Sequence, residues 1–237
     1  MSKVRNWQYR FVALLAIAVV AGTTIVPATT ASAQGKYGNL TARWWQWAQA
    51  QPAVDMGDTN TNPILDSTGE FAAVGQEDGI GPGNKYFFLT GTFGGDPVTR
   101  TVTVPQGKSL FFPIFNIEVD NAVDPPTSFR VPELRAMAAA IIDGAIVDSL
   151  VARLDGEDVD IFRTTSPAFH YTVPEENSLY DYFRLFGPQF EGTIGPAVAD
   201  GYWAVIPPLA PGEYTLEIES AAQGGFMLDV TYILTIE

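Results

Sequence analysis

Glycine and proline divide most of this chain into short segments, and this punctuation limits the fold more than any other feature. The 237 residues include 22 glycines and 17 prolines. Between them lie segments rich in β-branched and aromatic residues, such as 98–104 (VTRTVTV) and 109–119 (SLFFPIFNIEV). Such segments, bounded by turn residues, are typical of strands. Pro113 interrupts the second segment, where we expect an edge position or a bulge.

A first helix is predicted from Asn39 to Gln51. Asn39 is a favourable N-cap residue, and Pro52 cannot continue a helix. At 100° per residue, Trp44 and Trp47 share one apolar stripe and are expected in the core. Trp45 lies about 100° from Trp44, at the edge of that stripe, so we expect it to be the ring that faces solvent.

A second helix is predicted over 132–150, because Pro132 suits the first turn and the stretch that follows is rich in alanine. Val151 to Phe162 reads as a hairpin with an Asp155-Gly156 turn. Further strands are predicted at 85–92, 168–173, 202–206, 212–219 and 225–236, with a loop at 177–195. This pattern predicts a mainly β protein: an antiparallel, jelly-roll-like β-sandwich with two helical insertions.

The N-terminus has the three parts of an export signal. Lys3, Arg5 and Arg10 precede an apolar run of 12 residues at 11–22, and Ala31-Ser32-Ala33 is a small-residue cleavage motif. The alternative is a retained membrane anchor, but the run is shorter than the ~20 residues that span a bilayer. We therefore predict a signal peptide at 1–33 and a single β-sandwich domain at 34–237. The mature protein is expected to be secreted, periplasmic or on the cell surface, with no transmembrane segment.

Composition excludes several functions. The predicted signal peptide carries three of the 13 basic residues and no acid, so the mature chain has 10 basic against 27 acidic residues, a net charge of −17. Such a chain repels nucleic acid. It has no cysteine, which removes disulfides and thiolate metal sites, and a single histidine, His170. A nucleophilic serine elbow, G-x-S-x-G, is also missing.

Several motifs resemble a family of exported, β-rich bacterial proteins of unassigned function. They are WWQW (44–47), NPILDSTG (62–69) with AVGQ (73–76), RTVTVPQGKSLFFPIFNIE (100–118), LDGEDV (154–159), FRTTSPAFHYTVPEEN (162–177) and VADGYWAVIPPLAPGEYTLEI (198–218). The resemblance spans most of the mature chain and implies export and a β-rich fold, but no catalytic residue. Members often carry cysteines near the AVGQ and TVP segments, where this chain has Ala72 and Val102, so any family disulfide there is lost.

Alternating oxygen-bearing residues form the first candidate site. Asn116, Glu118 and Asp120 share one face of a predicted strand, and Asp124 follows. Such side chains suit Ca²⁺, which takes six to eight oxygen ligands. The alternative is a solvated acidic face that protects an edge strand from aggregation. An Asx-rich loop at 55–62 is a weaker calcium candidate, since such turns are common without metal.

Aromatic residues form the second candidate site. Trp45, Tyr182 and Trp203 are predicted ligand-binding residues, because exposed rings stack on sugar faces. Tyr202 and Trp203 are adjacent in a strand and must point to opposite faces. The alternative is core packing, which accounts for most large aromatic side chains.

These features predict an exported, non-enzymatic binding or surface-associated module, with a glycan or another cell-envelope component as its partner. No cofactor is required, and Ca²⁺ is a possible structural ion. One alternative is a carboxylate-dependent glycan-cleaving enzyme, which needs two acids about 5–9 Å apart. The other is a structural envelope or matrix protein without a small ligand.

Overall fold

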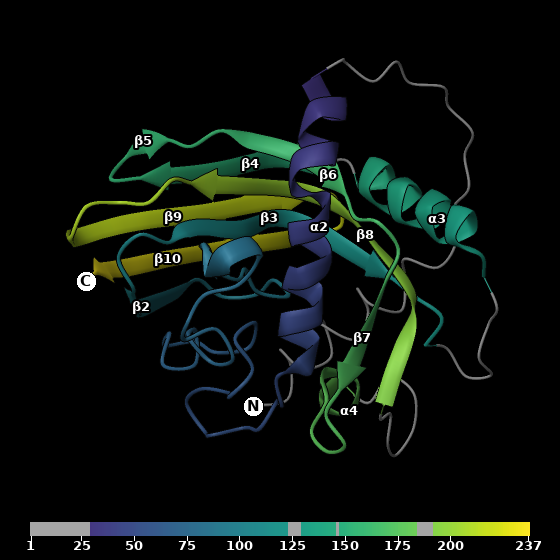
Figure 1. Ribbon diagram of the computed structural model, residues 1–237, viewed down its shortest axis with the longest axis horizontal. Coiled ribbons are helices and arrows are strands. Elements are labelled where there is room, and N and C mark those ends of the chain that lie inside the picture. Colours follow the sequence, from purple (N-terminus) through teal and green to yellow (C-terminus); the bar gives the residue numbers. More distant parts are fainter. Residues whose placement is uncertain (1–28, 123–128, 146, 184–191) are drawn as a thin grey trace.

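The protein is a β-sandwich with helical insertions, as the sequence predicts (Figure 1). The computed structural model describes residues 29–122, 129–145, 147–183 and 192–237. The basic and apolar parts of the predicted signal peptide lie outside these residues, as does Asp124. In chain order, the elements are α2 (Thr29–Ala50), η1 (Pro82–Asn84), β1 (Tyr86–Phe88), β2 (Val98–Val104), β3 (Ser109–Val119), α3 (Val131–Gly144), β4 (Val147–Leu154), β5 (Glu157–Asp158), β6 (Ile161–Thr165), β7 (Phe169–Val173), α4 (Leu179–Phe183), β8 (Gly192–Ile206), β9 (Gly212–Ala222) and β10 (Phe226–Ile236).

Each of the two sheets contains five strands. The first has the order β1-β3-β8-β6, with β7 paired to the far end of β8, and the second has the order β2-β10-β9-β4-β5. The expectation of purely antiparallel sheets is wrong at two places, because β1 runs parallel to β3 and β2 runs parallel to β10. Both parallel pairs join strands far enough apart in sequence for a crossover connection, which a hairpin-based prediction does not include.

Three layers build the core. The outer face of the first sheet packs against α2, with Trp44, Phe111 and Trp203 in the interface. The inner faces of the two sheets pack on each other through residues such as Phe112 and Val230. A smaller cluster lies beneath α3. Ala72 and Val102, the positions implied for family cysteines, both belong to the cluster between the sheets.

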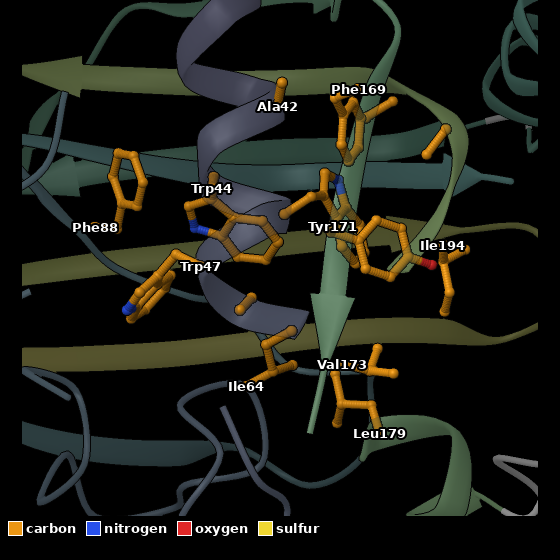
Figure 2. Close-up of a cluster of buried hydrophobic side chains, with 14 of the residues drawn as sticks. Ala42, Trp44, Trp47, Ile64, Phe88, Phe169, Tyr171, Val173, Leu179 and Ile194 are labelled. Atoms are coloured by element: carbon orange, nitrogen blue, oxygen red, sulfur yellow. The ribbon is translucent and has the colours of Figure 1, made fainter. Parts of the chain in front are cut away.

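Helix α2 is longer than predicted and is covered on more of its circumference. It begins at Thr29 and therefore contains the Ala31-Ser32-Ala33 motif. Trp44 and Trp47 are buried, as predicted, and their indole N–H groups donate to the carbonyls of Leu89 (2.9 Å) and Val74 (2.7 Å). These two bonds tie the helix to the loops beside β1. In Figure 2, both rings share an apolar cluster with residues of β7.

The predicted second helix ends early. Helix α3 stops at Gly144, and the residues predicted as its last turn instead begin β4 at Val147. Glycine weakens a helix, and the following valines and isoleucine favour a strand. The predicted turn at Asp155 and Gly156 is confirmed: both have positive φ (51° and 82°), as a tight hairpin between β4 and β5 requires.

The interruption at Pro113 is a bulge, one of the two outcomes predicted. The β3–β8 register shifts between Pro113 and Phe115, although β3 lies inside its sheet. Across from the bulged segment, a side chain at Gly201 would come within 2.5 Å of the Cα atom of Asn116. Glycine is therefore needed there for β8 to approach β3.

A buried arginine fastens the loops to the second sheet. Arg100 of β2 is 1% exposed, and no carboxylate is among its hydrogen-bond partners. Its guanidinium donates to the backbone carbonyls of Asp66 (2.6 Å), Thr90 (2.9 Å) and Ile64 (3.1 Å), and to the hydroxyl of Tyr232 (2.7 Å). The segment before β1 is thus bound to β2 and β10 through one side chain.

Candidate functional site

The strand face that carries the predicted calcium ligands runs into a buried polar cluster. Glu118 lies opposite Ala199 of β8, and Ala199 belongs to the core between the first sheet and α2. Because alternate residues share a face, Asn116, Glu118 and Asp120 all point toward that side. The sequence prediction that these three residues share one face is confirmed. All three residues are half-buried, and Nδ2 of Asn116 and Oε1 of Glu118 are shielded from solvent.

Two tyrosines complete this cluster. The hydroxyls of Tyr171 in β7 and Tyr180 in α4 both donate to Oδ2 of Asp120, the second at 2.6 Å, and they also contact each other. The other carboxylate oxygen of Asp120 accepts the backbone N–H of Ala122 at 2.6 Å. We call Glu118, Asp120, Tyr171 and Tyr180 the carboxylate–tyrosine cluster. It joins the end of β3 to β7 and α4, which lie about 50 and 60 residues further along the chain.

Burial in this cluster favours the protonated form of every group whose pKa shifts. Loss of solvation raises the pKa of Glu118 well above its ordinary value, and the neighbouring Asp120 charge and hydrogen bond raise it further. Loss of solvation also raises the pKa of Tyr171 and Tyr180, followed by repulsion from the nearby carboxylates. The arrangement thus holds three O–H groups around the Asp120 carboxylate.

Two polar atoms beside the cluster have no hydrogen-bond partner in the described protein. They are Oε1 of Glu118 and Nδ2 of Asn116. Thr164 lies in the same row as Asn116, on the other side of Gly201, and its hydroxyl is also buried without a partner. The indole N–H groups of Trp45 and Trp203, in the same core, also have no partner, and three further such atoms lie on Gln49, Asn60 and Asp181. Buried polar groups are normally bonded, so their concentration in one interlayer distinguishes this region.

Glu118 and Asp120 are the two acids of the carboxylate–tyrosine cluster. Glu118 lies close enough to Asp120 for the Asp120 charge to raise its pKa further, and retaining and inverting glycosidases hold their two acids about 5–9 Å apart. Among the described residues, no group of three or more histidine, cysteine, aspartate or glutamate side chains is arranged to hold a metal ion. The calcium prediction therefore rests on Asn116, Glu118 and Asp120 alone, with Asp124 outside the described residues.

The weaker calcium candidate, the Asx-rich loop, uses its polar groups for turns. Asp55 accepts the N–H of Gly57, and Asn60 accepts the N–H of Asn62. Nearby Asp66 accepts bonds from Thr59, Thr68 and Phe71. Burial raises the pKa of Asp66, but these hydrogen bonds outweigh it, so the net pKa is lowered.

Two of the three predicted sugar-stacking residues are buried. Trp45 is only 7% exposed, so the expectation that it faces solvent is wrong. The buried arc of α2 extends beyond the predicted stripe because β7 covers a second side of the helix. Trp203 is fully buried, stacked on Phe111 with ring centroids 5.0 Å apart, and its neighbour Tyr202 points to the other face and is half-buried.

Tyr182 is the predicted ligand residue that remains accessible. It lies in α4, is 39% exposed, and meets Phe183 edge-on at 5.2 Å. Phe183 in turn packs edge-on against Phe93 at 4.9 Å. Ser178 directly precedes the helix, and its hydroxyl and N–H exchange hydrogen bonds with Asp181. Tyr180 points inward as part of the carboxylate–tyrosine cluster. The helix α4, which carries the accessible ring of Tyr182, is therefore anchored to the core.

Sequence reasoning missed residues whose partners are distant. Tyr171 lies within a predicted strand, but nothing in the sequence marks it. Arg163 of β6 was also missed: it binds buried Asp200 of β8 with both Nε (3.1 Å) and Nη2 (2.7 Å) and reaches Asp143 of α3. The Asp200 hydrogen bond raises the pKa of Arg163 despite partial burial, and this pair fixes α3 beside the first sheet. Partners that meet only in the tertiary fold leave no local pattern of residues to read.

His170 is exposed on β7, which fits a surface histidine and not a catalytic base. Within the described residues, no helix has both the length and the apolar composition needed to cross a bilayer. The fold and cluster together define a mixed-strand β-sandwich with a helical outer layer and a buried carboxylate–tyrosine cluster. No protein-family model, curated protein or solved structure matches the chain.

Proposed function

We propose that the protein is an exported, non-enzymatic binding or surface-associated module, that glycan is its ligand class, and that Tyr182 is the contact residue. The observation that supports this proposal is the exposure of the Tyr182 ring on an anchored helix. An aromatic ring with few internal degrees of freedom loses little entropy when a sugar ring stacks on it. Export follows from the basic, apolar and small-residue parts of the first 33 residues.

The way in which α4 is fixed strengthens this choice. One turn of helix would not be stable alone, and here Tyr180, Ser178 and Asp181 hold it in place. The ring of Tyr182 is further restricted by its edge contact with Phe183. Buried Trp45 and Trp203 contribute to the core and not to contact with a polymer.

A non-enzymatic role fits the chemistry of the most perturbed acid. Burial and the neighbouring Asp120 raise the pKa of Glu118, which lies beside groups that belong to the core.

The test is retention on a panel of immobilised polysaccharides. Tyr182→Ala should abolish retention while the melting temperature stays within a few degrees, and Tyr182→Phe should preserve most of it. The matched control is Phe129→Ala, since Phe129 is equally exposed at 39% but lies beside α3. Equal retention of Tyr182→Ala and the parent protein would reject the assignment of Tyr182.

Two other outcomes discriminate the alternatives. Release of soluble sugar that disappears on replacing one acid would establish the glycan-cleaving enzyme. Co-fractionation with the cell envelope, without retention on any polysaccharide, would favour the structural protein. For calcium, we expect a higher melting temperature in Ca²⁺ than in EDTA, because an ion that binds only the folded chain stabilises it; equal melting temperatures would reject that prediction.

A further inference from the structure

A short loop between β1 and β2 is held at both ends by the second sheet. The loop runs from Gly91 to Gly95 (GTFGG), and we call it the 91–95 loop. At its beginning, Arg100 of β2 donates to the carbonyl of Gly91 at 3.2 Å. At its end, the N–H of Gly95 donates to the carbonyl of Met227 in β10 at 3.2 Å. The position of the loop is therefore set by the second sheet.

Glycine at position 94 allows the loop to approach β10 closely. Gly94 has a φ of 84°, a conformation that residues with a side chain rarely adopt. A side chain at this position would also come within 3.1 Å of the carbonyl oxygen of Met227 and 3.2 Å of the ring of Phe226. The loop can lie directly against the start of β10 because neither contact is made by glycine.

The ring of Phe93 extends from this loop to the other core. Phe93 is half-buried and packs against the cluster between the first sheet and α2, which also contains Phe183. The rings of Phe93 and Phe183 meet edge-on at 4.9 Å, a geometry that aromatic pairs prefer. Since Phe183 is the last residue of α4, the 91–95 loop connects the second sheet to the end of that helix.

Helix α4 is thus supported on both sides of Tyr182. On one side Tyr180 is bound to Asp120, and on the other Phe183 packs against Phe93. A helix of five residues is not stable by itself, so its position depends on tertiary contacts of this kind. Tyr180 and Phe183 are both buried, whereas the ring of Tyr182 is exposed.

We propose that Phe93 is a positioning residue for Tyr182, through which the 91–95 loop holds α4 in the orientation that presents the Tyr182 ring. Where it concerns a ligand, this inference rests on the proposed function. The action is indirect, because Phe93 meets Phe183, and Phe183 meets Tyr182 edge-on at 5.2 Å. Without the Phe93 ring, α4 loses a support, Tyr182 samples more orientations, and ligand binding costs more entropy.

Amide hydrogen exchange at Tyr182 tests the positioning without any ligand. The N–H of Tyr182 donates to the carbonyl of Ser178 at 2.9 Å, so its exchange reports the opening of α4. Phe93→Ala should accelerate this exchange about tenfold, since an aromatic edge contact and its buried area are both lost. Phe93→Tyr keeps the ring and should show the exchange rate of the parent protein. The matched control is Phe162→Ala, because Phe162 is also a half-buried ring with an aromatic partner, Tyr37, at 4.8 Å.

A second pair of variants displaces the loop without removing the ring of Phe93. Gly94→Ala should accelerate exchange at Tyr182, because the added methyl group meets β10 and moves the loop. Gly57→Ala is its control, since Gly57 has a similar φ of 92° but, apart from its chain neighbours, no described atom lies within 4 Å of a side chain placed there. Exchange at Tyr182 should be unchanged in this control.

Retention on cellulose, chitin and starch separates the positioning from the proposed function. If the parent protein is retained, Phe93→Ala should lower its affinity for that polysaccharide severalfold, and Phe162→Ala should not. Unchanged exchange at Tyr182 in Phe93→Ala, equal acceleration in Phe162→Ala, or accelerated exchange with unchanged affinity would each overturn the positioning role. Accelerated exchange in Phe93→Ala alone, with a parent protein that no polysaccharide retains, would support the positioning of α4 and reject glycan as the ligand.

Discussion

The sandwich contains two buried polar centres, and they differ in how completely their hydrogen bonds are satisfied. Around Arg100, the guanidinium donates to the carbonyls of four loop residues and to the hydroxyl of Tyr232, which itself donates to the carbonyl of Thr90. Around the carboxylate–tyrosine cluster, Asp120 is fully bonded, but Oε1 of Glu118 and Nδ2 of Asn116 have no partner in the described protein.

The difference indicates a purely structural role for Arg100, whereas the carboxylate–tyrosine cluster keeps buried groups whose hydrogen bonds are not all made. A satisfied buried charge recovers its desolvation cost through its bonds, whereas an unpaired buried group does not. Arg100 thus stabilises the contact between the loops around β1 and the second sheet. The carboxylate–tyrosine cluster both anchors α4 and retains groups whose protonation and bonding can change. The following substitutions test this contrast, from the largest expected effect to the smallest.

Replacing Arg100 should be the most damaging change. Arg100→Met would leave the buried carbonyls of Asp66 and Ile64 without donors, at about 1–3 kcal/mol for each unsatisfied group. We expect a loss of more than about 3 kcal/mol in the free energy of unfolding, measured by urea denaturation. The control Arg153→Met removes an ion pair of a half-exposed arginine and should cost less than about 1 kcal/mol. Similar losses for the two variants would contradict the fastening role.

Removing a donor from the carboxylate–tyrosine cluster should have an intermediate effect. Tyr171→Phe deletes one of the two hydroxyls on Oδ2 of Asp120 and should lower the free energy of unfolding by about 2 kcal/mol. Tyr214→Phe is the control, since its hydroxyl bonds the carbonyl of Ala210 at an exposed site. A neutral Tyr171→Phe would mean that Asp120 is held by its other partners alone.

The proton on Glu118 gives the third effect a defined pH dependence. Since the folded-state pKa is raised, the stabilisation is complete below the unfolded pKa of glutamate and is lost as pH rises through the folded-state pKa. Glu118→Gln keeps a neutral side chain, so the decline of the free energy of unfolding with rising pH should disappear in this variant. At the highest pH values of the series, the variant should be more stable than the parent protein by about 1 kcal/mol or more. The check is urea unfolding at a series of pH values. Parallel curves for the two proteins would show that Glu118 does not titrate with unfolding.

The smallest effect is expected at Thr164, and a second buried threonine, Thr90, provides the contrast. Thr164 has an unpartnered hydroxyl, so Thr164→Val should be neutral or stabilising by about 0.5 kcal/mol. Thr90 donates to the carbonyl of Pro63 and accepts from Arg100, so Thr90→Val should cost about 2 kcal/mol. Comparable costs at the two positions would remove the distinction between the centres.

Local signals in the sequence predicted the strands well. The bounds of β2 and β3 agree with the predicted 98–104 and 109–119, because alternation and turn residues define both ends. The predicted loop at 177–195 was wrong at both ends, since it contains α4 and the start of β8. A helix of one turn that depends on Tyr180 and Asp120 has no sequence periodicity to reveal it.

The candidate site was predictable only in part. Alternation placed Asn116, Glu118 and Asp120 on one face, but only the tertiary fold brings Tyr171 and Tyr180 to them. The error at Trp45 has a related cause. A helical stripe predicts which side is most apolar, not how many neighbours will cover the helix, and β7 covers the additional side.

The ionisation of Glu118 itself is the sharpest measure of the buried cluster. Carboxyl carbon NMR, with each glutamate assigned, follows individual groups as pH rises. We predict that Glu118 retains its proton at pH values where glutamate in a model peptide has ionised, and that Tyr171→Phe perturbs its titration. A Glu118 curve that coincides with that of the model peptide would contradict the buried, proton-bearing cluster.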